Sequence, residues 1–367
     1  MRPSKTKHSL HNMIESLCAW FELAQRDLPW RRRRSGYTAL VAETMLQQTQ
    51  VSRVIQRFQQ FMRAFPSVKA LAAADEQHVL TLWQGLGYYR RARNLHTAAR
   101  IIVRDFGGRV PQSREDLMRL PGVGRYTAGA IASIVFGRAE PIVDGNVGRV
   151  LARVFADDAS LAQPQALTEA EQRALAWKTA EGLVRRAKRP GVLNEALMEL
   201  GARVCLPSPA KPRCDACPIA HWCAAWSLGL QNQVPPVRPR AKPRLVDHHA
   251  VIVTRTRSNL ILFEQRGRAG MWQGLWQTPT IESAREMDAT AITASLRVAV
   301  SRLRKRGEFT HRTTHRVIRF HVYAAISRAR RGTWRRLDNL CDLPMSNAQQ
   351  RVLEFARCHP KQRDGHG

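Results

Sequence analysis

The apolar residues in the first 230 positions recur every three or four residues, the spacing of one face of an α-helix. Pro66 ends one such run, whose apolar side chains are Val51, Val54, Ile55, Phe58, Phe61, Met62 and Phe65. Ser113 lies three residues before Asp116, a spacing that resembles a capping box at a helix start. No segment here alternates between apolar and polar residues as a half-buried strand does. The pattern therefore predicts a mostly α-helical N-terminal region, residues 1–230.

The pattern changes after residue 230. Residues 231–246 are rich in proline and basic side chains, which predicts an extended, semi-rigid linker. Two later segments are rich in β-branched and aromatic residues and are predicted to be strands, 248–266 and 315–326. Two others have helical spacing, 291–307 and 347–358. Residues 247–360 are therefore predicted to form a smaller α/β domain.

Charge narrows the choice of partner. Lys and Arg number 59 against 29 Asp and Glu, which gives a formal net charge of +30 at pH 7. Such a charge attracts polyanions, and neutralising the phosphates of a nucleic acid releases its condensed counterions. Nucleic acid is the favoured partner, and a generic solubilising surface of arginines is the alternative.

The hydrophobic pattern also bears on location. No apolar run approaches the ~20 residues that span a bilayer. Glu15 and Glu22 interrupt the apolar residues near the N-terminus, so this segment lacks the h-region of a signal peptide. We therefore expect a cytoplasmic protein without membrane association.

A glycine-containing turn is predicted between two helices, in the sequence LPGVGRYTAG (120–129). Pro121 ends one helix, and a second starts near Arg125. The free backbone N–H groups at such a helix start suit a phosphate, so the predicted contacts are Gly122, Val123 and Gly124. A helix–hairpin–helix module of this kind contacts the DNA backbone without reading sequence. An ordinary turn between helices is the alternative.

Four of the seven cysteines are clustered, with the spacing C-x8-C-x2-C-x5-C: Cys205, Cys214, Cys217 and Cys223. Clustered cysteines in a reducing cytosol favour a metal site over disulfides. Both tetrahedral zinc and an iron–sulfur cluster use four thiolates. Zinc ribbons normally have two separated C-x2-C pairs, and the single pair here favours one 4Fe–4S cluster.

Two carboxylic acids have unusual surroundings. Glu43 is the only acidic residue between Leu28 and Ala74, a window that holds eight basic residues. It shares a helix face with apolar residues, and burial there would raise its pKa, as a general acid requires. Asp144 precedes a helix, whose N-terminus would keep it ionised. A raised acid beside an ionised one is used to break glycosidic bonds. The alternatives are a structural ion pair for Glu43 and a helix N-cap for Asp144.

Five motifs occur in the order of a known family: ETMLQQTQV (43–51), LWQGLGYYRRARNLH (82–96), LPGVGRYTAGAI (120–131), PIVDGNV (141–147) and NEALMELGA (194–202). Together they closely resemble the MutY-type adenine DNA glycosylases of the helix–hairpin–helix glycosylase superfamily. The resemblance covers most of residues 10–226. It implies a six-helix core at about 30–140 and a cluster-bearing part formed by 1–29 and 141–230.

The resemblance also implies a reaction and the residues that perform it. The family removes adenine mispaired with 8-oxoguanine or guanine in duplex DNA and leaves an abasic site. By similarity, Glu43 protonates the adenine ring and later activates water, and Asp144 stabilises the sugar cation. Tyr126 and Asn146 match residues that support these two. Further matches are to residues that line the adenine pocket: Trp30, Arg31, Leu46 and Glu195. Gln48 and Tyr88 match residues that wedge into the base stack.

The C-terminal domain resembles the MutT-like (Nudix-fold) domain that senses 8-oxoguanine, with GMWQGLWQTP (270–279) as the closest match. A Nudix catalytic box is missing, which argues against pyrophosphate hydrolysis. Alignment with the family's Phe-Ser-His reading motif selects Thr314 and His315, while Thr313 replaces the aromatic residue. The gap of eight residues between Cys205 and Cys214 is two longer than is usual in the family.

Three competing functions remain open. An endonuclease III-like glycosylase/lyase shares the hairpin, the Asp and the cluster, but it needs a lysine nucleophile where this chain has Tyr126. Gly148 stands where some family members have a lysine. A catalytically inactive lesion binder and a Nudix phosphohydrolase are the other two. The sequence favours a monomeric, monofunctional adenine glycosylase that acts on duplex DNA.

Overall fold

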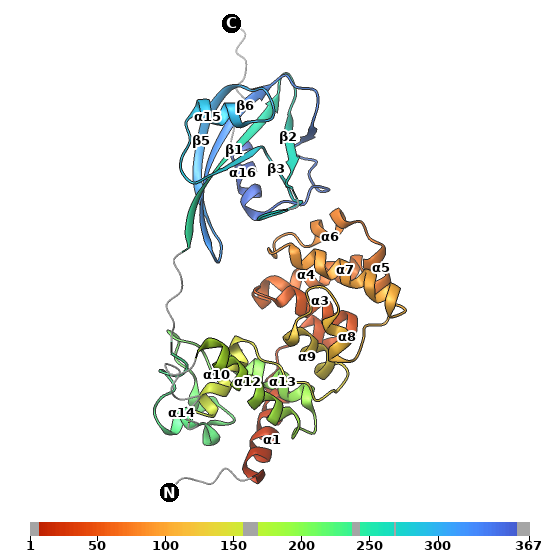
Figure 1. Cartoon of the computed structure of the whole chain (residues 1–367), viewed down its shortest axis with the longest axis vertical. Coiled ribbons are helices and arrows are strands. Elements are labelled where there is room, and N and C mark those ends of the chain that lie inside the picture. Colours follow the sequence, from red (N-terminus) through yellow and green to blue (C-terminus); the bar gives the residue numbers. More distant parts are fainter. Residues whose placement is uncertain (1–6, 157–167, 237–242, 268, 358–367) are drawn as a thin grey trace. The chain divides into compact units, whose positions relative to one another are not determined.

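The computed structural model describes residues 7–156, 168–236, 243–267 and 269–357. The described residues form two compact units (Figure 1). One contains the residues up to Ala73 and those from Asn94 to Pro239. The other contains Ala74–Arg93 and the residues from Arg240 onward. The first is helical and the second has a mixed sheet, so the predicted fold class is confirmed.

The first unit is built from helices that are mostly short. Two of them follow clear capping signals: Ser35 caps α3 and Ser113 caps α8, each by accepting a hydrogen bond from a backbone N–H three residues ahead. The α-helices wholly in this unit are α1 (Lys7–Ala24), α2 (Pro29–Arg32), α3 (Gly36–Leu46), α4 (Val51–Ala64), α5 (Val68–Ala73), α8 (Arg114–Met118), α9 (Arg125–Ile134), α10 (Gly145–Val154), α12 (Glu169–Val184), α13 (Pro190–Arg203) and α14 (Ala224–Ser227). Helix α7 (Arg90–Asp105) crosses from the second unit into the first. Two 3-10 turns, η1 (Cys214–Ala216) and η2 (Ala220–Trp222), lie in the cysteine-rich segment.

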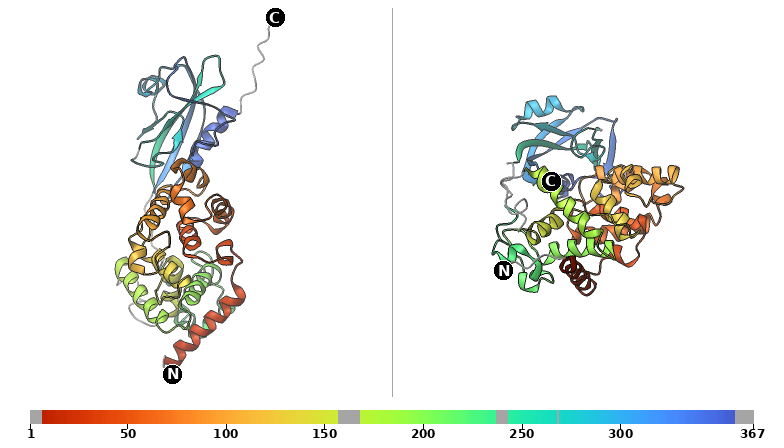
Figure 2. Two further views of the ribbon diagram at one scale, coloured as in Figure 1. Left: turned by 90° about the vertical axis from the view of Figure 1, so that its right-hand side faces the viewer. Right: turned by 60° about the horizontal axis from the view of Figure 1, so that its bottom comes forward.

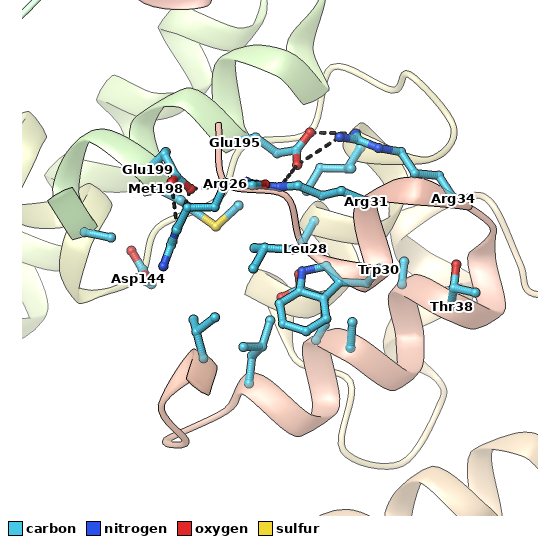
Figure 3. Close-up of a pocket in the computed structure, with 18 of the residues that line it drawn as sticks. Arg26, Leu28, Trp30, Arg31, Arg34, Thr38, Asp144, Glu195, Met198 and Glu199 are labelled. Carbon is cyan, nitrogen blue, oxygen red and sulfur yellow. Dashed lines mark hydrogen bonds and ion pairs between the residues drawn. The ribbon is translucent and has the colours of Figure 1, made fainter. Parts of the chain in front are cut away.

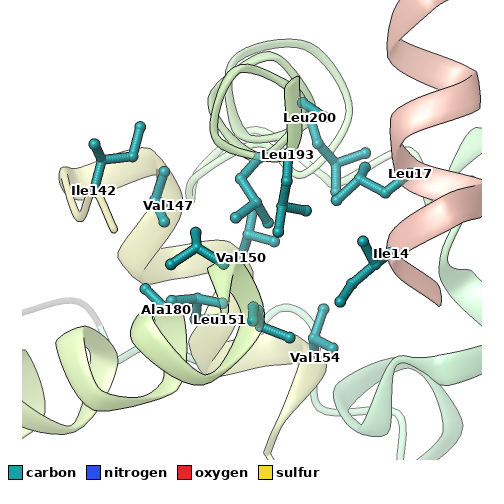
Figure 4. Packing of buried hydrophobic residues seen from close by; sticks show 14 of the residues in the cluster. Ile14, Leu17, Ile142, Val147, Val150, Leu151, Val154, Ala180, Leu193 and Leu200 are labelled. Carbon is teal, nitrogen blue, oxygen red and sulfur yellow. The ribbon is translucent and has the colours of Figure 1, made fainter. Parts of the chain in front are cut away.

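A buried apolar cluster joins the first helix to helices far along the chain (Figure 4). Helix α1 contributes Ile14 and Leu17, which pack with side chains of α10, α12 and α13. The members drawn and labelled include Val147, Val150, Leu151, Val154, Ala180, Leu193 and Leu200. This packing fixes α10 and α13, the two helices that carry Asp144 at one end and Glu195 in the interior.

The second unit contains a seven-stranded mixed sheet, whose main order is β3-β2-β1-β6-β5. Strands β1 and β6 run parallel, in register from Arg244 opposite Arg316 to Arg255 opposite Ser327. The other pairings are antiparallel. The strands are β1 (Arg244–Arg255), β2 (Leu260–Gln265), β3 (Trp276–Gln277), β4 (Thr280–Ser283), β5 (Ser301–Arg312), β6 (Arg316–Ser327) and β7 (Thr333–Arg336).

Two helices cover opposite faces of this sheet (Figure 2). Helix α16 (Asn347–Arg357) buries Val352 and Leu353 against one face. Helix α15 (Ala289–Ser295) buries Ile292 against the other. The segment 74–93, with α6 (Glu76–Leu82), belongs to the same unit. The hydrogen bonds that attach it include those from Trp276 Nε1 to Gln77 Oε1, 3.2 Å, and from Tyr89 Oη to the Met345 carbonyl, 2.8 Å.

The predicted helix over 291–307 is wrong beyond Ser295. Residues from Ser301 form β5, which pairs with β6, and Leu303 packs on the sheet core while Arg302 and Arg304 are exposed. In a short basic segment with scattered apolar residues, the apolar positions partly match both the helical period of 3.6 residues and the strand period of 2. Only the pairing with β6 decides in favour of a strand.

The C-terminal end of the predicted linker belongs to the sheet. Strand β1 already begins at Arg244, inside the predicted range 231–246. Residues 237–242 of that range lie outside the described residues. In the described segments, no helix is both long and apolar enough to cross a membrane.

The close approach of α13 to α9 yields a prediction about stability. A Cβ added at Gly191 would overlap the Ser133 carbonyl and lie 2.8 Å from the Ile134 Cα. We expect Gly191→Ala to lower the free energy of unfolding by about 1–3 kcal/mol, the usual range for overpacking. Chemical denaturation measures this change.

Gly182 in α12 provides the matched control. An added Cβ there meets only the Arg186 guanidinium, at 3.5 Å. Gly182→Ala is expected to raise the free energy of unfolding by up to about 1 kcal/mol, because alanine favours the helix. Equal effects of the two substitutions would contradict the packing argument.

Candidate active site

A cavity of about 270 Å³ opens in the first unit among α2, α3, α9, α10 and α13 (Figure 3). This volume is near the lower end of the range for small-ligand sites, roughly 300–1,000 Å³. The structure brings eight of the predicted residues together around it: Trp30, Arg31, Glu43, Leu46, Tyr126, Asp144, Asn146 and Glu195. Residues from positions 30 to 195 thus meet in one small space.

Glu43 lies on α3, in a turn that is otherwise buried. The pKa of its carboxyl is raised to about 7, mainly by burial and in addition by the nearby carboxylates of Glu195 and Asp144. A hydrogen bond with Tyr126 and the charge of Arg31 act in the opposite direction and lower this pKa. Glu43 therefore holds a proton up to neutral pH and can act as a general acid.

Asp144 is the N-cap of α10. Its Oδ1 accepts a hydrogen bond from the Val147 backbone N–H, 2.7 Å, and its Oδ2 accepts one from Asn146 Nδ2, 3.4 Å. The cap interpretation is therefore correct, and the cap also points the carboxylate into the cavity that Glu43 lines.

A chain of contacts leads from this carboxylate to the cysteine segment. Asn146 Oδ1 accepts a hydrogen bond from Arg149 Nη2, 2.9 Å. Arg149 Nε in turn donates to the Cys205 carbonyl, 2.8 Å. The orientation of Asn146 beside Asp144 is thereby linked to the backbone of Cys205.

Tyr126 stands in the first turn of α9. Its hydroxyl contacts Met198 Sδ at 3.0 Å and hydrogen bonds with Glu43. Burial raises the pKa of Tyr126 well above its ordinary value, so the phenol stays neutral. Among the described residues that line the cavity there is no lysine.

The polar wall of the cavity is a network of two glutamates and three arginines. Glu195 accepts hydrogen bonds from Arg31 Nε, 3.1 Å, and from both terminal nitrogens of Arg34, 2.6 and 3.1 Å. Glu199 accepts from Arg26 and Arg31. Trp30 forms an apolar wall, edge to face with Phe58 at a centroid distance of 5.5 Å.

Sequence reasoning missed Arg26, Met198 and Glu199, which also line the cavity. Glu199 had a usable signal, since it follows Glu195 by one helical turn in an otherwise apolar segment. Arg26 had none, because its approach to α13 is a tertiary contact.

The predicted phosphate contacts form the hairpin between α8 and α9. Gly122 has φ of +79°, a conformation that favours glycine, and the Val123 N–H bonds to the Leu120 carbonyl, 3.1 Å. Gly124 is the N-cap of α9, and no described side chain caps that helix. The first N–H groups of α9 are thus available for an external acceptor.

The four clustered cysteines line one cavity, together with Arg153. Arg153 Nη1 donates to Cys205 Sγ, 3.2 Å. Burial raises the pKa of Cys217 to about 12, which disfavours its thiolate unless a positive centre is present. In the described part of the chain, no three His, Cys, Asp or Glu side chains converge closely enough to hold a single metal ion.

The two predicted wedge residues share a rare backbone conformation. Gln48 has φ of +55° and Tyr88 has φ of +46°, although neither is glycine. Such strain of about 1–3 kcal/mol persists mainly at functional positions. Both side chains are exposed at the surface of their own unit.

The predicted lesion-reading residues lie in the turn between β5 and β6. Within the second unit, the Tyr88 hydroxyl is 2.5 Å from Thr314 Oγ1. Thr314 and His315 are exposed, while Thr313 closes the turn through hydrogen bonds with Arg316.

Comparison with known proteins identifies two families. Residues 41–176 match the HhH-GPD superfamily of base excision DNA repair proteins, and residues 250–355 match the NUDIX domain. The chain is 36% identical to the adenine DNA glycosylase of Homo sapiens, over 84% of this chain and 66% of the human protein. It is 33% identical to that of Mus musculus, over 94% of this chain and 78% of the mouse protein. A thermostable thymine-DNA glycosylase of known structure is similar over 61% of this chain and all of its own, with a TM-score of 0.53 and 27% identity.

The raised pKa of Glu43 predicts a pH-dependent gain in stability for Glu43→Gln. Between the unfolded pKa of 4.5 and the folded value of about 7, the native protein binds more protons than the unfolded chain, so its stability falls as pH rises. The amide of the variant does not ionise and lacks this penalty. We expect the stability difference between variant and wild type to grow by on the order of 2 kcal/mol from pH 5 to pH 8, at 1.36 kcal/mol per pKa unit. Denaturation at both pH values measures it, and a constant difference would contradict the assignment.

Proposed function

The chain belongs to the adenine DNA glycosylase family, within the HhH-GPD superfamily, and we propose that it hydrolyses the N-glycosidic bond of adenine mispaired with 8-oxoguanine or guanine in duplex DNA. The product is an abasic site in an uncut strand. The observation that carries the proposal is the pairing of a protonated Glu43 with Asp144 in one cavity lined by Tyr126.

The first step delivers the base to the cavity. A glycosylase must flip its target out of the duplex, which costs a few kcal/mol of unstacking and unpairing. The cavity suits a single flipped base, with the Trp30 ring on one wall and the polar network of Glu195 and Arg31 on another.

The second step breaks the bond between C1′ of the sugar and the base. Glu43 donates its proton to a ring nitrogen of the adenine, so the bonding electrons leave with a neutral base. The sugar becomes a cation, and the Asp144 carboxylate stabilises it electrostatically. Both roles fit the described environments, since Glu43 keeps its proton by burial and Asp144 is held by Val147 and Asn146.

The last step adds water. The Glu43 carboxylate accepts a proton from a water molecule while the oxygen of that water bonds to C1′. The proton transfer restores the acid form of Glu43. The Tyr126 hydroxyl steadies Glu43 through their hydrogen bond. A tyrosine provides no amine for a Schiff base, so the reaction is expected to end at the abasic site.

Binding of duplex DNA is supported by the hairpin and by charge. The uncapped start of α9 offers backbone N–H groups to a phosphate, which positions the duplex without reading sequence. We further propose that Gln48 and Tyr88 enter the base stack and that Thr314 and His315 contact 8-oxoguanine. The positive φ of the first two and the exposure of all four support this role.

We further propose that the cysteine cavity holds one 4Fe–4S cluster. The four thiols line one cavity, and among the described residues no three such side chains are placed to hold a single ion. Burial raises the pKa of Cys214, Cys217 and Cys223, which calls for positive charge beside them. Cys205, Cys214, Cys217 and Cys223 would hold the cluster, whose thiolate bonds would tie the loop into one rigid piece. Arg153 is placed to hydrogen bond to a ligand sulfur.

The proposed reaction predicts when the DNA strand is cut. Incubated with a duplex containing adenine opposite 8-oxoguanine, the protein is expected to release adenine and to yield strand breaks only after alkali or heat. Single-turnover assays with and without alkali measure this. Equal cutting under both conditions would overturn the monofunctional assignment.

Two glutamine variants serve as a matched pair in that assay. Glu43→Gln is expected to bind the duplex and to release adenine at least ~100-fold more slowly, the lower bound for general acid–base catalysis. Glu181→Gln, on the exposed side of α12, is expected to keep the wild-type rate. A near-normal rate for Glu43→Gln would remove Glu43 from the acid role.

The proposed 4Fe–4S cluster predicts that the purified protein absorbs visible light. Protein purified without oxygen is expected to show broad iron–sulfur absorption in the visible region with four iron atoms per chain. A Cys217→Ser variant is expected to lose most of that absorption, whereas the serine variant of the isolated Cys341 keeps it. A colourless protein with stoichiometric zinc would contradict the assignment.

A further inference from the structure

The polar wall of the base cavity contains a second buried carboxylate, that of Glu199. The Glu199 side chain is 1% exposed. Its Oε1 accepts a hydrogen bond from Arg26 Nε, 2.7 Å, and its Oε2 accepts from Arg26 Nη2 and Arg31 Nη2, both 3.1 Å. Glu199 thus holds two arginines that line the cavity.

Arg31 connects this carboxylate to Glu195. Its Nη2 donates to Glu199, its Nε donates to Glu195, and its Nη1 donates to the Arg26 carbonyl, each at 3.1 Å. All three nitrogens of the guanidinium have an acceptor, so its plane is fixed (Figure 3). Because a guanidinium is rigid and planar, fixing one end also fixes the donor that faces Glu195.

The contacts of Glu195 leave room for one more donor. A carboxylate has about four acceptor sites. Arg31 and Arg34 use two on Oε1, and Arg34 uses one on Oε2. The remaining site on Oε2 suits an exocyclic amino group, which donates. A purine without that amino group would leave the acceptor site on Glu195 unpaired. An unpaired polar group in the pocket discriminates between ligands more strongly than a change in apolar contact does.

A contribution to the stability of the fold does not explain why Glu195 and Glu199 are buried one turn apart on α13. Like charges at this spacing repel. Buried ion pairs seldom stabilise a fold more than apolar residues of the same size would. Burial raises the pKa of Glu199, yet the hydrogen bonds and charges of Arg26 and Arg31 bring that pKa below its ordinary value. Its charge is thus maintained at the wall of a ligand cavity.

We propose that Glu199 is a positioning residue for base selection: through Arg31 it fixes the Glu195 carboxylate so that its free acceptor site receives the 6-amino group of the flipped purine. This inference rests on the proposed function and deepens it. Glu199 acts on the base through Arg31 and Glu195.

The test compares two bases in the same duplex, opposite 8-oxoguanine: adenine, and purine without the 6-amino group. Single-turnover release rates are measured for the wild type and for Glu199→Gln. We expect Glu199→Gln to lower the adenine rate by about tenfold and the purine rate by less than about twofold, so that the ratio of the two rates falls. A role in folding alone would lower both rates by the same factor, and that result would overturn the inference.

Two further variants make the result unambiguous. Glu181→Gln repeats the change of charge at an exposed helix position and is expected to keep the wild-type ratio. If Glu199→Gln does not fold, Glu199→Asp replaces it. The shorter side chain keeps the charge but cannot reach both arginines, and its ratio is expected to fall at least threefold. An unchanged ratio in a folded variant would overturn the inference, whereas no adenine release by the wild type would overturn the proposed function itself.

Discussion

The proton on Glu43 is the constraint on which the rest of the active site depends. A carboxyl that releases its proton near its ordinary pKa cannot protonate a base at neutral pH, so the site needs burial to hold it. Burial is the largest cause of the raised pKa here, and the neighbouring carboxylates add to it. Both neighbours line the same cavity, and in the proposed reaction Asp144 stabilises the sugar while Glu195 contacts the base. The carboxylates that line the pocket therefore also help to keep Glu43 protonated.

The helical scaffold makes this arrangement possible at modest size. Three of the groups stand at or near helix starts, where the backbone itself fixes the side chain: Trp30 on α2, Tyr126 on α9 and Asp144 before α10. The apolar cluster that joins α1, α10, α12 and α13 then keeps these starts in place. Asp144 shows how structural and chemical roles coincide, since the oxygen that caps α10 belongs to the carboxylate that faces the cavity. Losing this residue would thus disturb a helix end as well as the proposed reaction.

Local signals in the sequence predicted much of this site, and tertiary contacts account for what they missed. Ser113, Pro66 and the hairpin glycines act on their own neighbours, so the helix boundaries around them are predictable. The surroundings of Glu43 and Asp144 marked both as candidates, but the resemblance was needed to assign them to one site, because nothing local brings residue 43 near residue 144. Arg26 was missed since its partner is more than 170 positions away. The strand β5 was misread as a helix because its edge position leaves most of its side chains exposed, so no clean period of two is imposed.

The long gap between the first two clustered cysteines ends in a single backbone bond. The Arg213 N–H donates to the Val204 carbonyl, 2.9 Å, so Cys205 is the first residue inside the loop that this bond closes and Cys214 is the first residue after it. The residues between form an exposed loop that this bond closes at its base. Arg149 and Arg153 hold the Cys205 and Leu206 carbonyls, so extra residues in the exposed part of the loop need not move Cys205. A motif search that demands one fixed cysteine spacing would overlook such chains, whereas one that allows the first gap to vary would retain them.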